Sequence, residues 1–192
     1  MTRSITTFFL GAVVLYSVAV SGCWSARESN AMPLVGSDSN VRSESTPTDL
    51  KFPKASGFVN DITGTLTAGE AEKIESGLHE LHRRGKIDFA IAIVRTTNGK
   101  DIYDYSLGMA KEWKIGSENG GVLLVVAIDD RKWRIQIDKK LEKEFTDAEI
   151  KAIGDTMAPH FREQKYSDGI KACVKALVDE LARRHDFERI IL

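Results

Sequence analysis

The sequence predicts an α/β fold, a three-layer α/β/α sandwich built on a small mixed β-sheet. Two short apolar runs, 89–94 and 122–128, are rich in β-branched residues, as buried strands are. A helical pattern separates them, which is typical of a parallel pair joined by a right-handed crossover. Segment 133–137 alternates apolar and polar residues after a very short connection, so it is predicted to pair antiparallel with the second run.

Capping signals mark the first two helices. Thr67 and Glu70 form a capping box, in which the hydroxyl accepts a backbone N–H and the carboxylate returns to the cap residue. Apolar residues then follow at helical spacing, and Gly85 marks the end of this helix. Asp101 is placed to cap a second helix between the two buried strands.

The last third of the chain is predicted to be helical. Thr146 and Glu149 repeat the capping box, and Pro159 is expected to kink or break the helix that they begin. A final helix is predicted near 167–184, where apolar residues recur at helical spacing. The predicted order is α-β-α-β-β-α-α, which corresponds to helices layered on a small sheet.

The chain is predicted to have three parts: a signal peptide at 1–22, Cys23 with a flexible tether at 23–56, and one domain at 57–188. Arg3 precedes the apolar run 8–20 and small residues follow it, which is the layout of a secretory signal. That run is shorter than the roughly 20 residues that a membrane-spanning helix needs, so its removal is expected. The tether is rich in Ser, Asn, Asp and Pro and lacks an apolar period, which indicates a spacer.

The residues Val20-Ser21-Gly22-Cys23 resemble the bacterial lipoprotein signal, in which the cysteine is acylated and becomes the first residue. The resemblance implies that Cys23 carries acyl chains such as palmitate and anchors the protein to a membrane of the cell envelope. Trp24 follows the cysteine, where an aspartate would favour retention at the inner membrane. In an organism with two membranes we therefore expect the outer membrane, on its periplasmic side. A plain signal peptide that ends near a cysteine is the alternative.

Charge and cysteine content narrow the classes of function. The chain has 27 Lys and Arg against 28 Asp and Glu, and this net charge of -1 gives no basic excess to favour nucleic acid as a partner. It has only 2 cysteines, so an acylated Cys23 leaves Cys173 with none to pair with. Cys173 lies in the apolar period of the final helix, where a free cysteine acts as a small hydrophobe.

Short motifs along the domain resemble the TPM domain family, found in bacterial envelope proteins and in a chloroplast lumen protein linked to photosystem II repair. They include Val59-Asn60-Asp61, Asn119-Gly120-Gly121-Val122, Asp129-Asp130-Arg131-Lys132, Pro159-His160-Phe161 and Tyr166-Ser167-Asp168-Gly169. The resemblance implies a compact α/β/α fold outside the cytoplasm, divalent-cation binding in some members and phosphatase activity proposed for others. It also implies an accessory or assembly role more than that of a committed enzyme. One departure is Asp138-Lys139-Lys140, which replaces the family's glycine-rich turn.

Polar side chains are expected to gather at one edge of the sheet. Ligands favour the crevice outside the carboxyl ends of parallel strands, where Thr96-Thr97-Asn98 and Asp129-Asp130 follow the two runs. Asp61, in the loop before the first helix, is expected to fold over the same edge. Hard cations such as calcium or magnesium take such oxygen ligands from separate loops. The predicted metal ligands are Asp61, Asp129 and Asp130, with Asn60, Thr97 and Asn98 as additional ligands.

Each of these aspartates also has a simpler explanation. Aspartates are favoured in tight turns, so the hairpin alone accounts for Asp129 and Asp130, and an Asx turn leading to Gly64 accounts for Asp61. A second acidic group is expected at the opposite end of the strands as a solvated rim. It consists of Glu118, Asp138 and Glu142.

Three hypotheses for the function follow. The first is a divalent-cation-binding accessory or interaction module, which serves a protein partner in the assembly or maintenance of envelope proteins. The second is a metal-dependent phosphomonoesterase, which would use the same carboxylates for the metal and Arg131 for the phosphate. The third is a structural spacer of the envelope that binds no metal.

Overall fold

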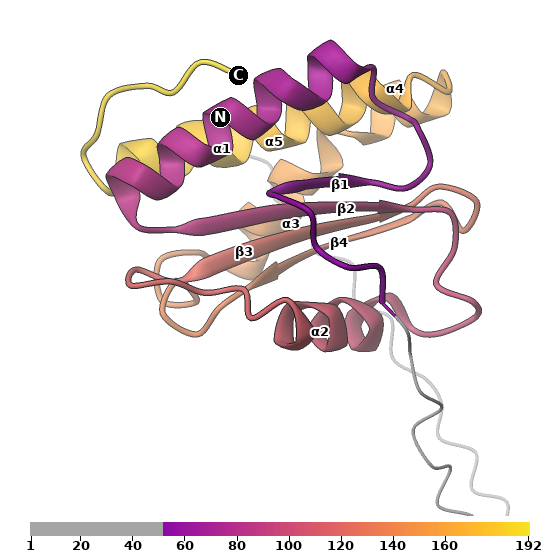
Figure 1. Cartoon of the computed structure of the whole chain (residues 1–192), viewed down its shortest axis with the longest axis horizontal. Coiled ribbons are helices and arrows are strands. Elements are labelled where there is room, and N and C mark those ends of the chain that lie inside the picture. Colours follow the sequence, from indigo (N-terminus) through magenta and orange to yellow (C-terminus); the bar gives the residue numbers. More distant parts are fainter. Residues whose placement is uncertain (1–51) are drawn as a thin grey trace, which may run out of the picture. The chain divides into compact units, whose positions relative to one another are not determined.

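A four-stranded β-sheet lies between two layers of helices in the computed structural model, which describes residues 52–192 (Figure 1). The strands neighbour one another in chain order: β1 (Val59–Asp61), β2 (Asp88–Val94), β3 (Gly121–Ala127) and β4 (Lys132–Ile137). The first three strands run parallel, and β4 is antiparallel to β3. The predicted α/β/α fold with a mixed sheet is confirmed.

The predicted signal peptide, the lipidated cysteine and nearly all of the tether lie outside the described residues. Among residues 52–192, every helix is too short or too polar to be a candidate for spanning a membrane. Phe52 and Pro53, in the segment that the sequence assigns to the tether, contact helix α2 (Ile102–Glu112) and its end. The Phe52 ring centroid lies 5.2 Å from that of Tyr105, and Trp113 Nε1 donates a hydrogen bond to the Pro53 carbonyl at 2.8 Å.

Strand β1 is absent from the prediction. The loop predicted at Asp61, before the first helix, is wrong, because Asp61 is the last residue of β1 and pairs with Ile93 of β2. A strand of three residues is too short to show alternation, so its position is determined by pairing with a distant segment. The Ile91 N–H donates to the Phe58 carbonyl at 2.7 Å, and this bond fixes the register.

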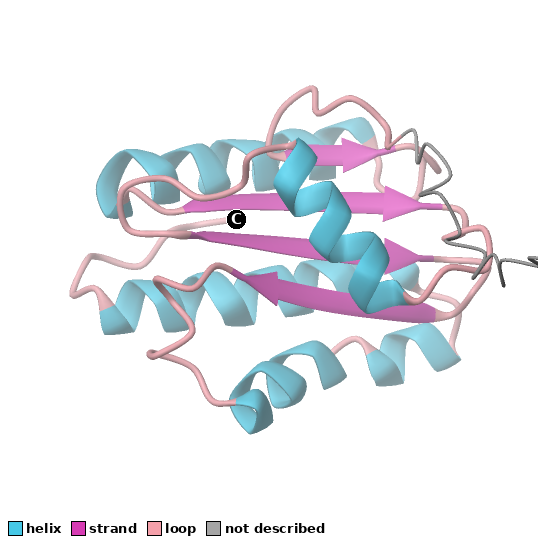
Figure 2. Ribbon diagram, turned by 90° about the horizontal axis from the view of Figure 1, so that it is seen from below, coloured by secondary structure: helices cyan, strands magenta, loops and turns pink. Residues whose placement is uncertain are grey.

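The two crossovers between parallel strands have opposite hands. Helix α1 (Ala68–Gly85) follows β1 and packs on one face of the sheet, whereas α2 follows β2 and packs on the other. Because the chain moves in the same direction across the sheet both times, helices on opposite faces require opposite hands. Figure 2, seen from the α2 side, shows the predicted right-handed crossover through α2 and a left-handed one through α1, behind the sheet. Left-handed connections are roughly 2% of such units.

Three helices follow the sheet: α3 (Asp147–Asp155), α4 (Ala158–Arg162) and α5 (Tyr166–Arg184). Pro159 lies in the first turn of α4, so the chain breaks between α3 and α4 as predicted. Helix α5 lies alongside α1 on the face of the sheet away from α2 (Figure 1). Helix α3 packs against β4 and α5.

The two faces of the sheet bury different cores. Beneath α1 and α5, the main core contains large side chains such as Phe89 and Leu124, both fully buried. On the α2 side the sheet presents Ala90 and Ala92 to Met109, so the small side chains let α2 lie close to the sheet. Each fully buried large aliphatic or aromatic side chain contributes about 1.5–3 kcal/mol, so the main core supplies most of the apolar stabilisation.

Cys173 belongs to the main core, in agreement with its apolar setting in the sequence. It is a free cysteine with no exposed surface, and burial raises the pKa of its thiol to about 12. A thiol with so high a pKa is a poor nucleophile at neutral pH, so Cys173 acts as a packing residue.

Helices α1 and α3 are each linked to α5 through the glutamate of a capping box. Both predicted capping boxes form. Glu70 of the first box also accepts a hydrogen bond from Lys171 of α5, and Glu149 of the second pairs with Arg184 at 2.7 Å. The Lys171 ammonium group and Thr67 hold the pKa of Glu70 down at about 2.

Candidate functional site

The carboxyl ends of β2 and β3 lie side by side, as their parallel order predicts. Val94 pairs with Ala127 at the end of the ladder. Just beyond it, the Asp129 N–H donates to the Arg95 carbonyl at 2.9 Å, so the pairing extends into the loops. The segments 96–98 and 129–131 are therefore neighbours at one edge of the sheet.

Asp130 joins these two loops. Its Oδ1 accepts a hydrogen bond from Thr96 Oγ1 at 2.8 Å, and its Oδ2 accepts one from the Thr97 backbone N–H at 2.7 Å. Thr97 Oγ1 also lies 3.0 Å from Oδ2, and Thr97 is only 1% exposed. The Thr97 N–H and the Thr96 hydroxyl hold the pKa of Asp130 below its usual value, because they stabilise the charged form. Asp130 is therefore a fixed negative charge at this edge.

The hairpin turn closes without the side chain of Asp130. Arg131 adopts a φ of 52°, and its N–H donates to the Ile128 carbonyl at 3.2 Å. Asn98 in the neighbouring loop has a φ of 55°, and its N–H donates to Thr96 Oγ1 at 3.0 Å. Positive φ is uncommon for an arginine, so the contacts of the hairpin must hold Arg131, whereas an asparagine such as Asn98 adopts it more readily. The carboxylate of Asp130 serves the neighbouring loop instead of its own turn.

Asp61 lies at the same edge but uses its oxygens in its own turn. Oδ1 accepts from the N–H groups of Thr63 and Gly64 at 2.9 and 3.0 Å, and Oδ2 accepts from that of Leu66 at 2.7 Å. This is the Asx turn that was the simpler explanation of Asp61, here leading to the start of α1. Asn60 is 5% exposed, and its side chain bonds to the backbone just before β1.

The oxygen chemistry of the edge suits a hard cation. A carboxylate has about four lone-pair sites. Hydrogen bonds from Thr63 Oγ1 and the three N–H groups use those of Asp61, and Asp130 has little capacity left. Asp129 is exposed, which makes it the most accessible of the three. In the part of the chain that the structure describes, no group of three or more His, Cys, Asp or Glu side chains is placed to hold a metal ion. The metal site therefore stays a prediction.

A pocket of about 470 Å³ opens beside this edge. Arg131 from the hairpin and Arg162 from α4 line it, together with Trp133, Phe161 and Tyr166. From the sequence, only Arg131 is predicted at this edge. Arg162 is not predicted there, because packing against α5 brings α4 to the edge, and no spacing in the sequence indicates that packing.

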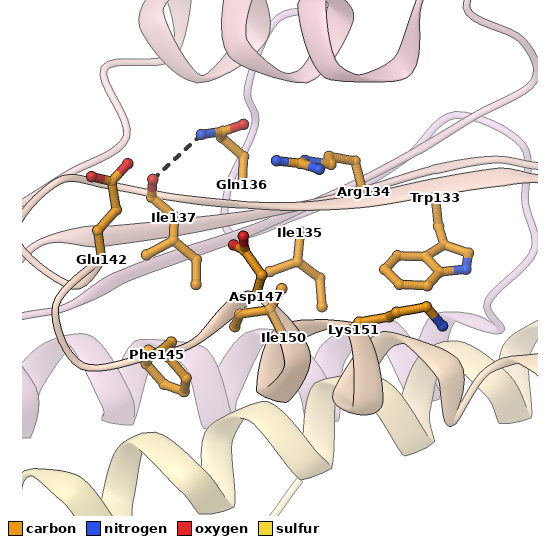
Figure 3. A pocket seen from close by; sticks show the side chains of 10 residues that line it. All are labelled: Trp133, Arg134, Ile135, Gln136, Ile137, Glu142, Phe145, Asp147, Ile150 and Lys151. Carbon is orange, nitrogen blue, oxygen red and sulfur yellow. Dashed lines mark hydrogen bonds between the residues drawn. The ribbon is translucent and has the colours of Figure 1, made fainter.

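A second pocket, called the β4 groove below, is the space of about 600 Å³ between strand β4 and helix α3. Figure 3 shows Trp133, Ile135 and Ile137 pointing from the strand toward α3. Arg134 and Gln136 point to the other face of the sheet, and they also line the groove. The groove therefore runs along the outer edge of β4.

A left-handed first crossover, a mixed sheet and an oxygen-rich carboxyl edge define the class, a small α/β/α domain with its polar loops at one end of the parallel strands. The chain belongs to the TPM domain family, which matches residues 59–180. The resemblance noted in the sequence is thereby confirmed.

Solved structures of bacterial proteins share this fold. The N-terminal domain of a protein from P. gingivalis is 27% identical with a TM-score of 0.63, over 68% of this chain and 85% of that one. The BA42 protein of the psychrophilic bacterium Bizionia argentinensis is 19% identical with a TM-score of 0.56, over 67% and 90%. The N-terminal domain of a Corynebacterium glutamicum protein is 15% identical with a TM-score of 0.52, over 66% and 82%. No curated protein matches the chain.

Proposed function

We propose that this TPM domain is an accessory and interaction module of the cell envelope, anchored through acylated Cys23 and regulated by calcium or magnesium at its carboxyl edge. The observation that carries the proposal is the charged Asp130, held between two loops by Thr96 and Thr97 beside the exposed Asp129. Membership of the TPM family supports a role of this kind.

In this proposal Asp129 is the first ligand of the cation. Asp130 adds its remaining lone pair, and the amide oxygen of Asn98 lies on the neighbouring loop. Calcium takes 6–8 oxygen ligands, so water or the carboxylate and carbonyl oxygens of a partner protein would complete the shell. A bound ion also cancels negative charge at the edge, and it thereby changes which partner charges the surface favours.

Calorimetry of the soluble chain, made with Cys23→Ser, tests the cation site. Calcium or magnesium is expected to release or absorb heat on binding and to raise the melting temperature. At a hundredfold excess over the dissociation constant the gain is about 2.7 kcal/mol. Asp129→Asn is expected to weaken binding at least about tenfold, because it removes the most accessible carboxylate. Glu118→Gln, which removes one charge near the opposite end of the strands, is the matched control. If neither ion gives heat on binding or changes the melting temperature, the proposal is contradicted.

Fractionation of cells tests the anchor. With Cys23→Ser the protein is expected to move from the membrane to the soluble extracytoplasmic fraction, because no acyl chain can be attached. Cys173→Ala, at the buried cysteine, is expected to leave the protein on the membrane. A Cys23→Ser protein that remains membrane-bound would show that another feature holds it there.

A metal-dependent phosphomonoesterase is the second candidate, and the pocket lined by Arg131 and Arg162 favours it. A guanidinium group can bind a phosphate through two parallel hydrogen bonds. The pocket also adjoins the hairpin that carries Asp129 and Asp130. Hydrolysis of p-nitrophenyl phosphate that needs magnesium, and that Asp129→Asn and Arg162→Gln both abolish, would establish the enzyme. Turnover no higher than that of the variants would exclude it.

A further inference from the structure

We propose that the β4 groove binds an extended segment of a partner protein, which joins the sheet as an added strand beside β4. The inference rests on the interaction role proposed above and gives it a surface and a kind of partner. Extended peptides bind exposed sheet edges in this manner: main-chain hydrogen bonds supply the affinity, and side chains at alternate positions supply the specificity.

The main-chain groups of β4 point alternately toward β3 and toward the groove. The Asp138 N–H, just past the strand, donates to the Gly121 carbonyl of β3 at 2.8 Å. Every second residue of β4, counted back from Asp138, therefore bonds to β3. The N–H and C=O groups of the residues between them, Trp133, Ile135 and Ile137, point outward. Within residues 52–192 the one hydrogen bond to these groups is a long one, 3.4 Å, from a glutamine side chain to the Ile137 carbonyl (Figure 3).

The walls of the groove suit a segment with alternating side chains. The α3 side is apolar, with Ile135 and Ile150 among its residues. On the other side, Arg134 Nε and Gln136 Oε1 are buried and have no hydrogen-bond partner among the described residues. A strand placed here would direct apolar side chains toward α3 and polar ones toward this second wall.

The length and lining of the groove fit one extended segment. Strand β4 has 6 residues, about 20 Å at the usual rise. Helix α3 forms the far wall, and its Gly154 packs so closely on Trp133 that a Cβ there would lie 2.0 Å from the ring. Because α3 stands beside β4, a single extended segment needs less room there than the sheet of a second copy would. The occupant is therefore a terminal or flexible segment of a partner.

Charge gives this segment a direction. Glu142 and Asp147 are exposed; Glu142 lies at the Ile137 end of the groove, and Asp147 lies between Ile137 and Ile135 (Figure 3). At the Trp133 end, Lys151 is already paired with Asp155. A segment antiparallel to β4 begins at the Ile137 end, so a partner that is basic at the N-terminal side of its extended stretch is favoured.

A labelled synthetic peptide of two lysines followed by valine and serine in alternation tests the inference with the soluble full chain. Fluorescence anisotropy is expected to show binding. N-methylation of one alternate set of residues should weaken it at least about tenfold, because those N–H groups bond to β4, whereas methylation of the other set should leave it nearly unchanged. No binding of the unmethylated peptide, or equal effects of both methylated sets, would overturn the inference.

Charge reversal in the groove provides a second measurement. Glu142→Lys is expected to weaken binding of the lysine-bearing peptide about fivefold, because it removes an attraction at the end where the peptide begins. Glu72→Lys, on the exposed side of α1, should have no such effect. An identical effect of both variants would show that net charge and not the groove governs binding, which would overturn the inference.

The cation site and the groove fail separately in these experiments. The peptide titration is run once with calcium and once with a chelator, on the sample that gives the heat of cation binding. If cation binding depends on Asp129 and the peptide does not bind, only the groove inference is overturned. If the peptide binds in the groove and neither ion gives heat, only the proposed cation site is overturned.

Discussion

The sheet ends in β1 on one side and in β4 on the other, and the neighbouring helices cover these two edges differently. At β1, the carboxylate of Glu75 from α1 accepts the N–H groups of Phe58 and Val59 at 2.9 and 2.6 Å. At β4, helix α3 lies alongside, but no side chain of the described residues accepts a hydrogen bond from the outward N–H groups. Exposed strand edges pair readily with other chains, so proteins usually shorten or cover them. Here a side chain of α1 satisfies an outward N–H group of the short edge, whereas the long edge is left able to bind.

A glycine near each edge sets how closely the helix approaches. A Cβ at Gly57 would lie 2.7 Å from Glu75 Oε1, so glycine lets the carboxylate reach the backbone of β1. A Cβ at Gly154 would lie 2.0 Å from the Trp133 ring, so glycine there lets α3 rest on a side chain. The first contact satisfies main-chain donors, whereas the second leaves them free beside the β4 groove.

The largest expected effect comes from opening the closed edge. Glu75→Ala is expected to lower the free energy of unfolding by about 3 kcal/mol, because two part-buried N–H groups lose a charged acceptor. Urea denaturation measures the change. Glu72→Ala, exposed on the same helix, should stay within about 0.5 kcal/mol of the wild type. A loss in Glu75→Ala no greater than in this control would show that β1 does not depend on the carboxylate.

Displacing α3 from β4 is expected to lower the free energy of unfolding by less than Glu75→Ala does. Gly154→Ala should lower the free energy of unfolding by about 2 kcal/mol, because the new methyl group collides with the Trp133 ring. Gly69→Ala in α1 has no atom within 4 Å of the new Cβ and should be neutral or stabilising by up to about 1 kcal/mol. Thermal unfolding compares the two. Similar melting temperatures would mean that α3 moves freely against β4.

Acid is expected to weaken the helix that closes β1. The folded-state pKa of Glu70 is about 2, below its ordinary 4.5, so its contribution is fully present above about pH 4.5 and lost as the pH falls toward 2. The wild type should therefore lose more stability than Glu70→Gln over this range, measured as urea midpoints at several pH values. Glu72→Gln is expected to retain the wild-type slope. Parallel slopes for Glu70→Gln and the wild type would remove Glu70 as the acid-sensitive group.

The smallest expected effect is a difference in amide hydrogen-exchange rates along β4, which is measured on the unchanged protein. The amides of Arg134 and Gln136 bond to β3 and should exchange slowly, whereas those of Ile135 and Ile137 point to the groove and should exchange faster by about tenfold or more. The Val59 amide, although at an edge, should be protected by Glu75. Nuclear magnetic resonance resolves the individual amides. Uniform protection along β4 would mean that its edge already has a partner in the folded chain.

Elements that local chemistry determines are predictable from this sequence. The capping boxes at Thr67 and Thr146, the cap at Asp101 and the break at Pro159 all form where the sequence indicates. Strand β1 escapes prediction because its residues pair with β2 and its donors bond to Glu75, which lies 16 residues beyond Val59. Contacts over such a separation leave no periodic pattern in the chain.

The candidate site likewise has features that the sequence predicts and features that it does not. The order of strand, helix and strand is enough to place 96–98 beside 129–131, since parallel strands end at the same edge. How the oxygens are used depends on side-chain geometry: Asp61 turns into its own loop, whereas Asp130 reaches across to Thr97. The β4 groove requires the strand order and the position of α3, and both are set by packing of distant segments.

The left-handed crossover through α1 bears on the order in which the chain folds. Strand β1 pairs with β2 over only three residues, whereas β2 pairs with β3 over seven and β4 joins β3 through a hairpin, so we expect β2, β3 and β4 to pair first. Helix α2 then occupies one face, and the larger apolar side chains remain exposed on the other. When β1 adds to the free side of β2, α1 has only that second face to cover. The rare hand then follows from which face is still vacant when the last strand arrives.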